Sequence, residues 1–170
     1  MHLINRETTH LLAGEGRVLW LLGELVTLKV SAEQTGGAYS LFEVVSQPGG
    51  GPPPHVQHQE DECFWVLEGE FEVLDDKRVF VAGPGSLVYV PRGNLHTYKN
   101  VGENIGKLLV SQTPGGLHER FFEELGEEAN DPNAPPPVAD GSLDVARIVE
   151  TAARYGIEIP PPPPEDSGVL

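Results

Sequence analysis

The sequence contains a single cysteine, Cys63, among its 170 residues, so no disulfide bond can form within the chain. Its neighbours Glu62 and Phe64 carry no positive charge that would lower the pKa of the thiol. We therefore expect Cys63 to be a small buried residue rather than a reactive nucleophile. The shortage of cysteine also favours a reducing compartment.

Basic residues are scarce as well, because 11 lysines and arginines stand against 26 aspartates and glutamates, for a formal net charge of −15. This charge repels phosphate backbones and anionic lipid, so we expect neither nucleic acid nor a membrane surface as a partner. Long apolar runs are also missing. The run VLWLLGELVTLKV near the N-terminus contains Glu24 and is shorter than the ~20 residues of a membrane-spanning helix. No secretory pattern precedes it, and we expect a cytoplasmic protein.

The central part of the chain consists of short segments rich in β-branched and aromatic residues. Between Val18 and Thr113 these segments are separated by Gly, Pro, Asn and Asp at the spacing of an all-β sandwich or barrel. The pattern predicts one all-β domain, with helices only after Pro114. The segments VLWLLGELVTLKV and AYSLFEVVS carry apolar residues on both faces, which indicates a barrel that pairs as a homodimer.

The pattern changes after Pro114, where LHERFFEELGEE has apolar residues at helical spacing and Gly126 as a stop signal. A second helical pattern follows Ser142, which we expect to cap it, and stops at Gly156. Prolines are concentrated before and after this second helix. The chain therefore divides into a β-barrel domain at 1–126, a Pro-rich linker at 127–141, a C-terminal helix at 142–156 and a Pro-rich tail at 157–170.

One short stretch, GGGPPPHVQHQEDE, concentrates histidines and carboxylates behind a Pro/Gly turn. Residues two apart project to the same face of a strand, so His55 and Gln57 would point one way and His58 the other. Glu62 begins the next β-rich segment, where it can face the same cavity. From this stretch alone, surface histidines beside acidic residues are the more ordinary explanation.

A second polar position, His96, lies in PRGNLHTYKN, after a Pro/Gly turn and before another β segment. Imidazole and carboxylate groups that converge from separate strands suit Fe, Mn, Ni, Cu or Zn better than Ca or Mg. We expect His55 and Glu62 on adjacent strands and His96 on a third. The two stretches together predict a site for one divalent transition metal ion.

The two stretches also resemble the paired sequence motifs of the cupin superfamily, in its single-domain, type-2 form. The resemblance spans about residues 36–113 and implies a jelly-roll β-barrel, here with short C-terminal α-helices. The positions that match the two motifs, at 49–69 and 85–100, are Gly49, His55, Glu62 and Gly69, and Gly85, Pro91, Gly93, His96 and Asn100.

The chain departs from the family pattern where a second histidine is expected, since Gln57 and His58 compete for that position. Face alternation favours Gln57, which would offer a neutral amide oxygen, whereas ligand strength favours His58, which a local bulge could turn inward. The metal ligands implied by the resemblance are therefore His55, Gln57, Glu62 and His96, with His58 as the alternative to Gln57. A glutamine ligand would weaken metal binding.

The segments EQTGGAYSLFEVV and GGLHERFFEELG are further similar to bacterial quercetinase-like cupins, the flavonol dioxygenases. This resemblance implies a metal-dependent dioxygenase that acts on a small aromatic or enolic substrate, with Glu62 as the catalytic base. Two alternatives stay open: a cupin that binds a small molecule or metal without turnover, and a metal-dependent sugar isomerase or epimerase.

Other residues of the motif region have structural explanations. We expect Glu60 and Asp61 to be solvated turn residues. Asn100 is expected to cap a turn. Large aromatic side chains are more often core residues than substrate contacts, and we assign this role to Phe42, Phe64, Trp65, Phe71, Tyr89 and Tyr98.

Overall fold

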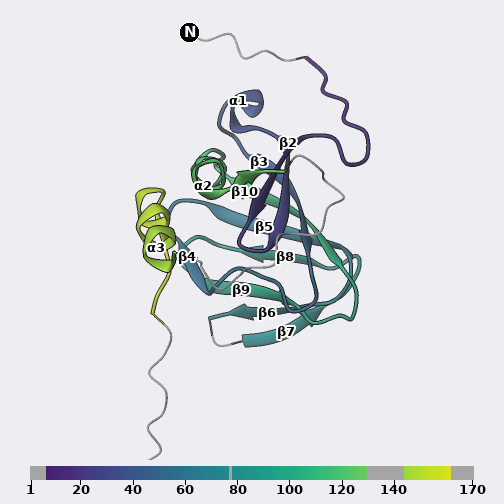
Figure 1. The fold of residues 1–170 in the computed structure, drawn as a ribbon, viewed down its shortest axis with the longest axis vertical. Coiled ribbons are helices and arrows are strands. Elements are labelled where there is room, and N and C mark those ends of the chain that lie inside the picture. Colours follow the sequence, from purple (N-terminus) through teal and green to yellow (C-terminus); the bar gives the residue numbers. More distant parts are fainter. Residues whose placement is uncertain (1–6, 77, 130–143, 162–170) are drawn as a thin grey trace, which may run out of the picture.

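The computed structural model describes residues 7–76, 78–129 and 144–161. Its strands form two antiparallel sheets, and helices α2 and α3 lie beside one another at one side of them (Figure 1). This is a β jelly-roll, and the predicted all-β domain between Val18 and Thr113 is confirmed. One part of that prediction is wrong: a single helical turn, α1 (Ala32–Thr35), precedes Pro114, because Ser31 caps it with a reciprocal Ser31–Gln34 capping box.

The first sheet has seven strands and the second has five. The seven-stranded sheet is, in spatial order, β11 (Glu127–Glu128), β1 (Arg17–Leu21), β2 (Glu24–Val30), β3 (Ser40–Ser46), β10 (Gly106–Thr113), β5 (Asp61–Glu68) and β8 (Leu87–Val90). The five-stranded sheet is β12 (Ile157–Glu158), β4 (His55–Gln57), β9 (Leu95–Asn100), β6 (Phe71–Asp75) and β7 (Arg78–Ala82).

The core lies between the inner faces of the two sheets. Along β3, buried and partly buried residues alternate, as the period of a strand requires. Phe64 and Leu108 from the first sheet and Phe71 and Val73 from the second are fully buried in one cluster. This cluster is mainly apolar, so the buried polar groups described below stand out against it.

Two aromatic residues that the sequence places in the core lie on the surface instead. Trp65 and Tyr89 are 49% and 61% exposed, whereas Phe42, Phe64, Phe71 and Tyr98 are buried as expected. Both exposed rings lie on the outer face of the first sheet, because β5 and β8 alternate and their inward positions are filled by other apolar residues. Cys63, expected to be buried, is partly exposed on the same face.

Helix α2 (Leu117–Leu125) confirms the first helical prediction, including its end at Gly126. Helix α3 (Val145–Arg154) confirms the second, but Asp144 caps it instead of Ser142, which lies outside the described residues. The Asp144 carboxylate accepts a hydrogen bond from the backbone N–H of Arg147, 3.0 Å away.

Two short strands lie within the ranges predicted as linker and tail. Glu127 and Glu128 pair with β1, and Ile157 and Glu158 pair with β4. Both short strands form because edge strands β1 and β4 would otherwise leave backbone N–H and C=O groups unpaired. The rest of the linker from 130 and of the tail from 162 lies outside the described residues.

None of the helices in the described part of the chain has the length and apolar character needed to cross a membrane. Location in the cytoplasm remains a prediction.

Candidate metal centre and its pocket

The two candidate imidazoles come from neighbouring strands of the five-stranded sheet. His55 of β4 stands directly opposite His96 of β9 in the strand register, and the ring centroids lie 4.3 Å apart. Gly51 precedes His55 at a tight crossing over β9: its φ is +156°, and a Cβ there would lie 2.0 Å from the carbonyl oxygen of Tyr98. Only glycine permits this close approach, which brings the start of β4 against β9.

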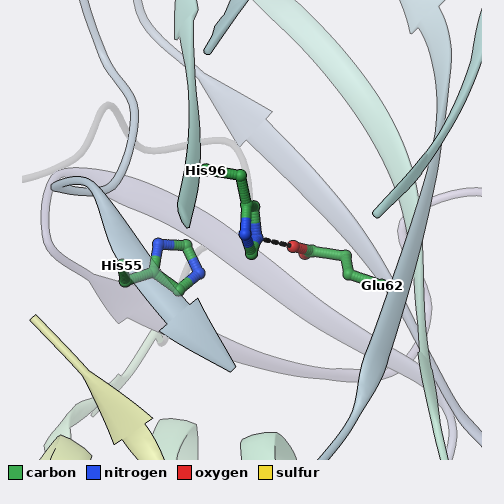
Figure 2. A group of neighbouring side chains, drawn as sticks. All are labelled: His55, Glu62 and His96. Carbon is green, nitrogen blue, oxygen red and sulfur yellow. Dashed lines mark hydrogen bonds and ion pairs between the residues drawn. The ribbon is translucent and has the colours of Figure 1, made fainter. Parts of the chain in front are cut away.

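The carboxylate comes from the opposite sheet. Glu62 of β5 reaches across the barrel, and its Oε2 lies 2.6 Å from Nε2 of His96 (Figure 2). Ligand atoms of His55, Glu62 and His96 all lie within 4.8 Å of one another, and all three side chains are buried. The expectation that His55 and Glu62 occupy adjacent strands is wrong, because β4 and β5 belong to different sheets. The three residues converge because the two sheets face each other.

Each imidazole is oriented by a backbone carbonyl two residues earlier in the chain. Nδ1 of His55 lies 3.0 Å from the carbonyl oxygen of Pro53, and Nδ1 of His96 lies 3.0 Å from that of Asn94. An Nδ1–H that donates to a carbonyl leaves Nε2 free to act as an acceptor or a metal ligand. In His96, this Nε2 is the atom that faces Glu62.

Gln57 and His58 are placed on opposite sides of β4. Gln57 is 2% exposed, and its Nε2 donates to Glu62 Oε2 at 3.4 Å. His58 points outward, where its Nε2 lies 2.9 Å from Glu158 Oε2. Gln57 therefore occupies the position at the cluster, while its amide oxygen is buried without a hydrogen-bond partner among the described residues.

The Glu62 carboxylate is held by further donors. Nε2 of Gln112, a fully buried residue of β10, donates to Glu62 Oε1 at 3.0 Å. Burial alone would raise the pKa of Glu62, but the hydrogen bond and charge of His96, with the nearby imidazoles of His55 and His118, lower it to about 2.

The two imidazoles respond to this environment in opposite directions. Burial, followed by the neighbouring His96, lowers the pKa of His55 to about 3. Burial also acts to lower the pKa of His96, but its hydrogen bond with Glu62 and the negative charge of that carboxylate raise it above its ordinary value. His55 is therefore a neutral imidazole, the form that binds metals, at physiological pH.

Sequence reasoning missed His118, the second residue of α2. This residue is 6% exposed, and its Nδ1 lies 3.3 Å from Nε2 of Gln57. Its ring centroid lies 6.2 Å from that of His55. The one available signal was a histidine at the start of the predicted helix in GGLHERFF, but helical periodicity says nothing about what the start of a helix packs against.

Glu60 explains how His118 is held in place. The expectation of a solvated side chain is wrong, because Glu60 is 1% exposed and accepts hydrogen bonds from the backbone N–H groups of Leu117 and His118 at 3.0 to 3.2 Å. It thus caps α2, whose N-cap residue, Gly116, has no side chain. Asp61 is only partly buried, in an ion pair with Arg92, and that neighbour lowers its pKa to about 2.

A pocket opens beside the cluster and is predominantly apolar. His55, Glu62 and His118 contribute polar groups to it, and Glu24 and Tyr98 contribute two more. The remaining lining consists of Leu21, Leu22, Val26, Val44, Pro52, Pro53, Val110, Phe121, Phe122, Ile157 and Ile159. Walls from β2, β10, α2 and the C-terminal segment thus enclose the space next to the three candidate ligands.

The donor set fits a divalent transition metal ion. Two imidazoles and one carboxylate, with each imidazole oriented through its second nitrogen, are typical ligands for Fe, Mn, Ni, Cu and Zn. Gln57 adds a buried amide oxygen that has no hydrogen-bond partner among the described residues. A half-turn of the amide would place this oxygen where the amide nitrogen now faces Glu62. The chemistry of the residues present thus fits a divalent transition metal ion.

Comparisons with known proteins agree with this geometry. The chain is 26% identical to quercetin 2,3-dioxygenase of Bacillus subtilis over 115 residues, which cover 68% of this chain and 34% of that enzyme. It is 31% identical to Nectarin-1 of Nicotiana langsdorffii x Nicotiana sanderae over 134 residues, which cover 71% of this chain and 54% of that protein. The chain thus spans about a third to a half of the length of these relatives.

Among solved structures, the polyketide cyclase RemF of Streptomyces resistomycificus superposes with a TM-score of 0.56 at 20% identity, over 63% of this chain and 80% of that one. This likeness concerns the fold. The sequence profile of the cupin domain matches residues 42–111, a range that includes His55, Glu62 and His96. With its jelly-roll fold and both sequence motifs, this chain contains a cupin domain over residues 42–111.

Proposed function

We propose that the protein is a metal-dependent dioxygenase, similar to quercetinases, that acts on a small aromatic or enolic substrate. One observation carries the proposal: His55, Glu62 and His96 form a buried cluster, and two of them, His55 and Glu62, line a pocket that is otherwise mainly apolar. A polar substrate end could meet the metal there while a flat apolar body packs against Phe121 and Phe122. The distant similarity to quercetin 2,3-dioxygenase supports the same reaction class.

His55, Glu62 and His96 would hold the metal ion, with Gln57 as a weaker fourth ligand through its amide oxygen. Fe, Mn, Ni, Cu and Zn all accept this set. When bound, such an ion supplies open coordination positions at which a substrate oxygen and dioxygen can meet. The apolar walls exclude water, which would otherwise compete for these positions.

Glu62 is the candidate general base. A phenolic or enolic hydroxyl that enters the pocket would transfer its proton to a carboxylate oxygen of Glu62. Gln112 and Gln57 donate to this carboxylate from two sides, so its position is defined before the substrate arrives. The low pKa of Glu62 means that the carboxylate is ionised, the form that binds a metal ion, at neutral pH.

A second candidate, a cupin that binds a small molecule or metal without turnover, is favoured by Gln57. An amide in place of an imidazole weakens the ligand set for a transition metal. The sugar isomerase or epimerase has less support, because no lysine or arginine is among the described residues that line the pocket to bind a phosphate.

The distinguishing experiment has two steps. Elemental analysis of protein purified without added metal identifies the bound ion, and an oxygen electrode then records oxygen consumption with a panel of flavonols and other enols. Oxygen uptake that depends on both the metal and a flavonol would support the dioxygenase. Tight flavonol binding without oxygen uptake would support the binding protein, and protein that stays metal-free with excess Fe, Mn, Ni, Cu or Zn would contradict the metalloenzyme.

We also propose a homodimer, formed through the outer face of the seven-stranded sheet. Trp65 and Tyr89 are exposed on this face together with Leu87, which stands opposite Trp65 in the strand register. Strand β8 lies at the edge of the sheet. A second copy of the chain could therefore cover the exposed apolar side chains of this face and also extend beyond β8. These side chains lie on β5 and β8, whereas among the described residues the two segments from which pairing was predicted expose one large apolar side chain, Tyr39.

A further inference from the structure

Glu24 is a buried carboxyl group in the pocket that the proposed metal chemistry does not use. It is 6% exposed and lines the pocket from the first position of β2. The preceding turn, Leu22–Gly23, has positive φ at both residues, 51° and 84°, as the tight turn of a β-hairpin requires. Leu21 and Leu22, which directly precede Gly23 and Glu24 in the chain, also line the pocket.

The contacts of Glu24 leave half of its carboxyl group unused. The Tyr98 hydroxyl donates to Oε2 at 2.9 Å, whereas Oε1 is buried and has no hydrogen-bond partner among residues that the structure describes. Ser46 stands opposite Glu24 in the strand register, and its hydroxyl lies close enough to the Glu24 carboxyl group to act on its pKa, although among the described residues neither Ser46 Oγ nor Glu24 Oε1 has a partner in hydrogen-bonding geometry. An unpaired oxygen in an apolar pocket is unfavourable unless something binds to it.

The lining around Glu24 contains no cation that could compensate its charge, as far as the described residues show. Burial therefore raises its pKa to about 7, against weaker opposing effects of Ser46 and Tyr98. Glu62, the other carboxylate of the pocket, is ionised and paired with His96. The pocket thus has two carboxyl groups with different partners, one in the candidate metal cluster and one apart from it.

We propose that Glu24, held in place by Tyr98, binds a second hydroxyl group of the substrate and so determines which aromatic compounds the pocket selects. This inference rests on the proposed function, which places the first substrate oxygen at the metal cluster. A hydroxyl suits the position because it both donates and accepts, and therefore pairs with a carboxylate or with a carboxylic acid. Tyr98 occupies Oε2, so the substrate hydroxyl would bind Oε1.

Specificity follows from the cost of leaving Glu24 unpaired. A substrate without the second hydroxyl buries Oε1 under an apolar ring and leaves it without a partner, whereas a matching hydroxyl satisfies it. Val26, Val44 and Val110 line the same pocket and offer no alternative hydrogen bond through their side chains. The position of the hydroxyl on the substrate ring should therefore matter more than the number of hydroxyls.

The test measures dissociation constants by anaerobic fluorescence titration, so that no turnover is needed. The probes are flavonol and a series of flavonols that each carry one further hydroxyl at a different ring position. Wild type should bind one member of the series roughly tenfold more tightly than flavonol itself. Glu24→Leu should abolish this preference, and Glu24→Gln, which keeps the size and hydrogen-bonding ability, should retain part of it. Glu72→Gln, on the exposed face of β6, is the matched control.

The outcomes separate the inference from the proposed function. Flavonol binding with the same positional preference in wild type and Glu24→Leu would overturn the role of Glu24 and leave the dioxygenase intact. Failure of wild type to bind any of the flavonols would overturn the proposed substrate class, and the inference with it. Circular dichroism checks that both Glu24 variants fold. If Glu24→Leu does not fold, the test uses the single variants Tyr98→Phe and Glu24→Gln instead. Retention of the full preference in both of these variants would overturn the inference.

Discussion

The side-chain amide of Gln57 lies 3.3 Å from Nδ1 of His118, although the two residues are 61 positions apart in the chain. This contact joins the strand of the first motif to the helix that follows the barrel. The same amide nitrogen faces Glu62 at 3.4 Å, so it lies between a candidate ligand and the helix. We therefore expect His118 to influence the orientation of the Gln57 amide, and with it whether the amide oxygen or the amide nitrogen faces a metal ion in the cluster.

We therefore predict that His118→Ala weakens metal binding about 10-fold to 100-fold, as the loss of a residue that orients a ligand typically does. His118→Gln should restore part of the affinity, because a side-chain amide can donate to or accept from the Gln57 amide in either of its orientations. Competition with a chromogenic chelator measures affinity, and electron paramagnetic resonance of Cu-loaded protein reports the geometry. His58→Ala, on the exposed side of β4, is the control; equal effects of the two alanine variants would contradict this role.

His96→Ala should remove most of the bound metal, with a loss of affinity greater than about 100-fold, because a ligand contributes more than a residue that orients one. Elemental analysis after dialysis measures the remaining occupancy. The variant also leaves Glu62 without its strongest hydrogen bond, so its thermal unfolding must be recorded alongside. A folded His96→Ala protein with full metal occupancy would show that the ion does not bind at this cluster.

Gln57→His should tighten metal binding, since it places an imidazole donor at the inward position of β4. His58→Ala should change the affinity by less than about 2-fold, because this side chain is half exposed and pairs with Glu158 outside the pocket. Isothermal titration with Zn²⁺ and Ni²⁺ compares both variants with wild type. Loss of metal in His58→Ala, with no change in Gln57→Ala, would show that His58 is the ligand.

Glu24 should make folding stability depend on pH. The pKa of Glu24 is about 7 in the folded protein, whereas the ordinary pKa of a glutamate side chain is 4.5. At pH values between these two, the folded state therefore binds more protons than the unfolded state. Stability therefore falls as pH rises from 4.5 through 7, by up to about 3 kcal/mol for a difference of 2.5 pH units.

Glu24→Gln removes this titration. Measured by urea unfolding, the stability of the variant relative to wild type should rise between pH about 4.5 and pH about 8. Glu72→Gln, at an exposed position, should show no such change. A constant difference between Glu24→Gln and wild type across this range would mean that Glu24 titrates normally.

The proposed dimer predicts a mass of twice 18.4 kDa by light scattering at micromolar concentration. Trp65→Glu combined with Tyr89→Glu should produce monomers, because two charges would be buried in an apolar interface. Val79→Glu combined with Val81→Glu is a matched control, since these valines are 60% and 61% exposed on β7 of the other sheet. Wild-type protein of monomeric mass would contradict the dimer outright.

Much of the fold could be predicted from the sequence because it depends on local patterns. Alternation predicted β3, the spacing of turns predicted the barrel, and helical periodicity with Gly126 predicted α2 together with its end. The two tandem motifs also indicated His55, Glu62 and His96 as candidate metal ligands. The spacing of a motif can be recognised in the sequence without knowledge of what packs around its residues.

The rest was decided by tertiary structure, because it depends on what packs against each residue. Glu60 follows a Pro/Gly-rich stretch like a surface residue, yet it is buried because the uncapped end of α2 needs an acceptor. Trp65 is a large apolar residue of the kind usually found in a core, yet the alternation of β5 directs its side chain outward. His118 and Glu24 lie far from both motifs along the chain, and only the closure of the barrel brings them to one pocket. Sequence spacing determines which face of an element a residue occupies, whereas the contacts between elements determine what that face meets.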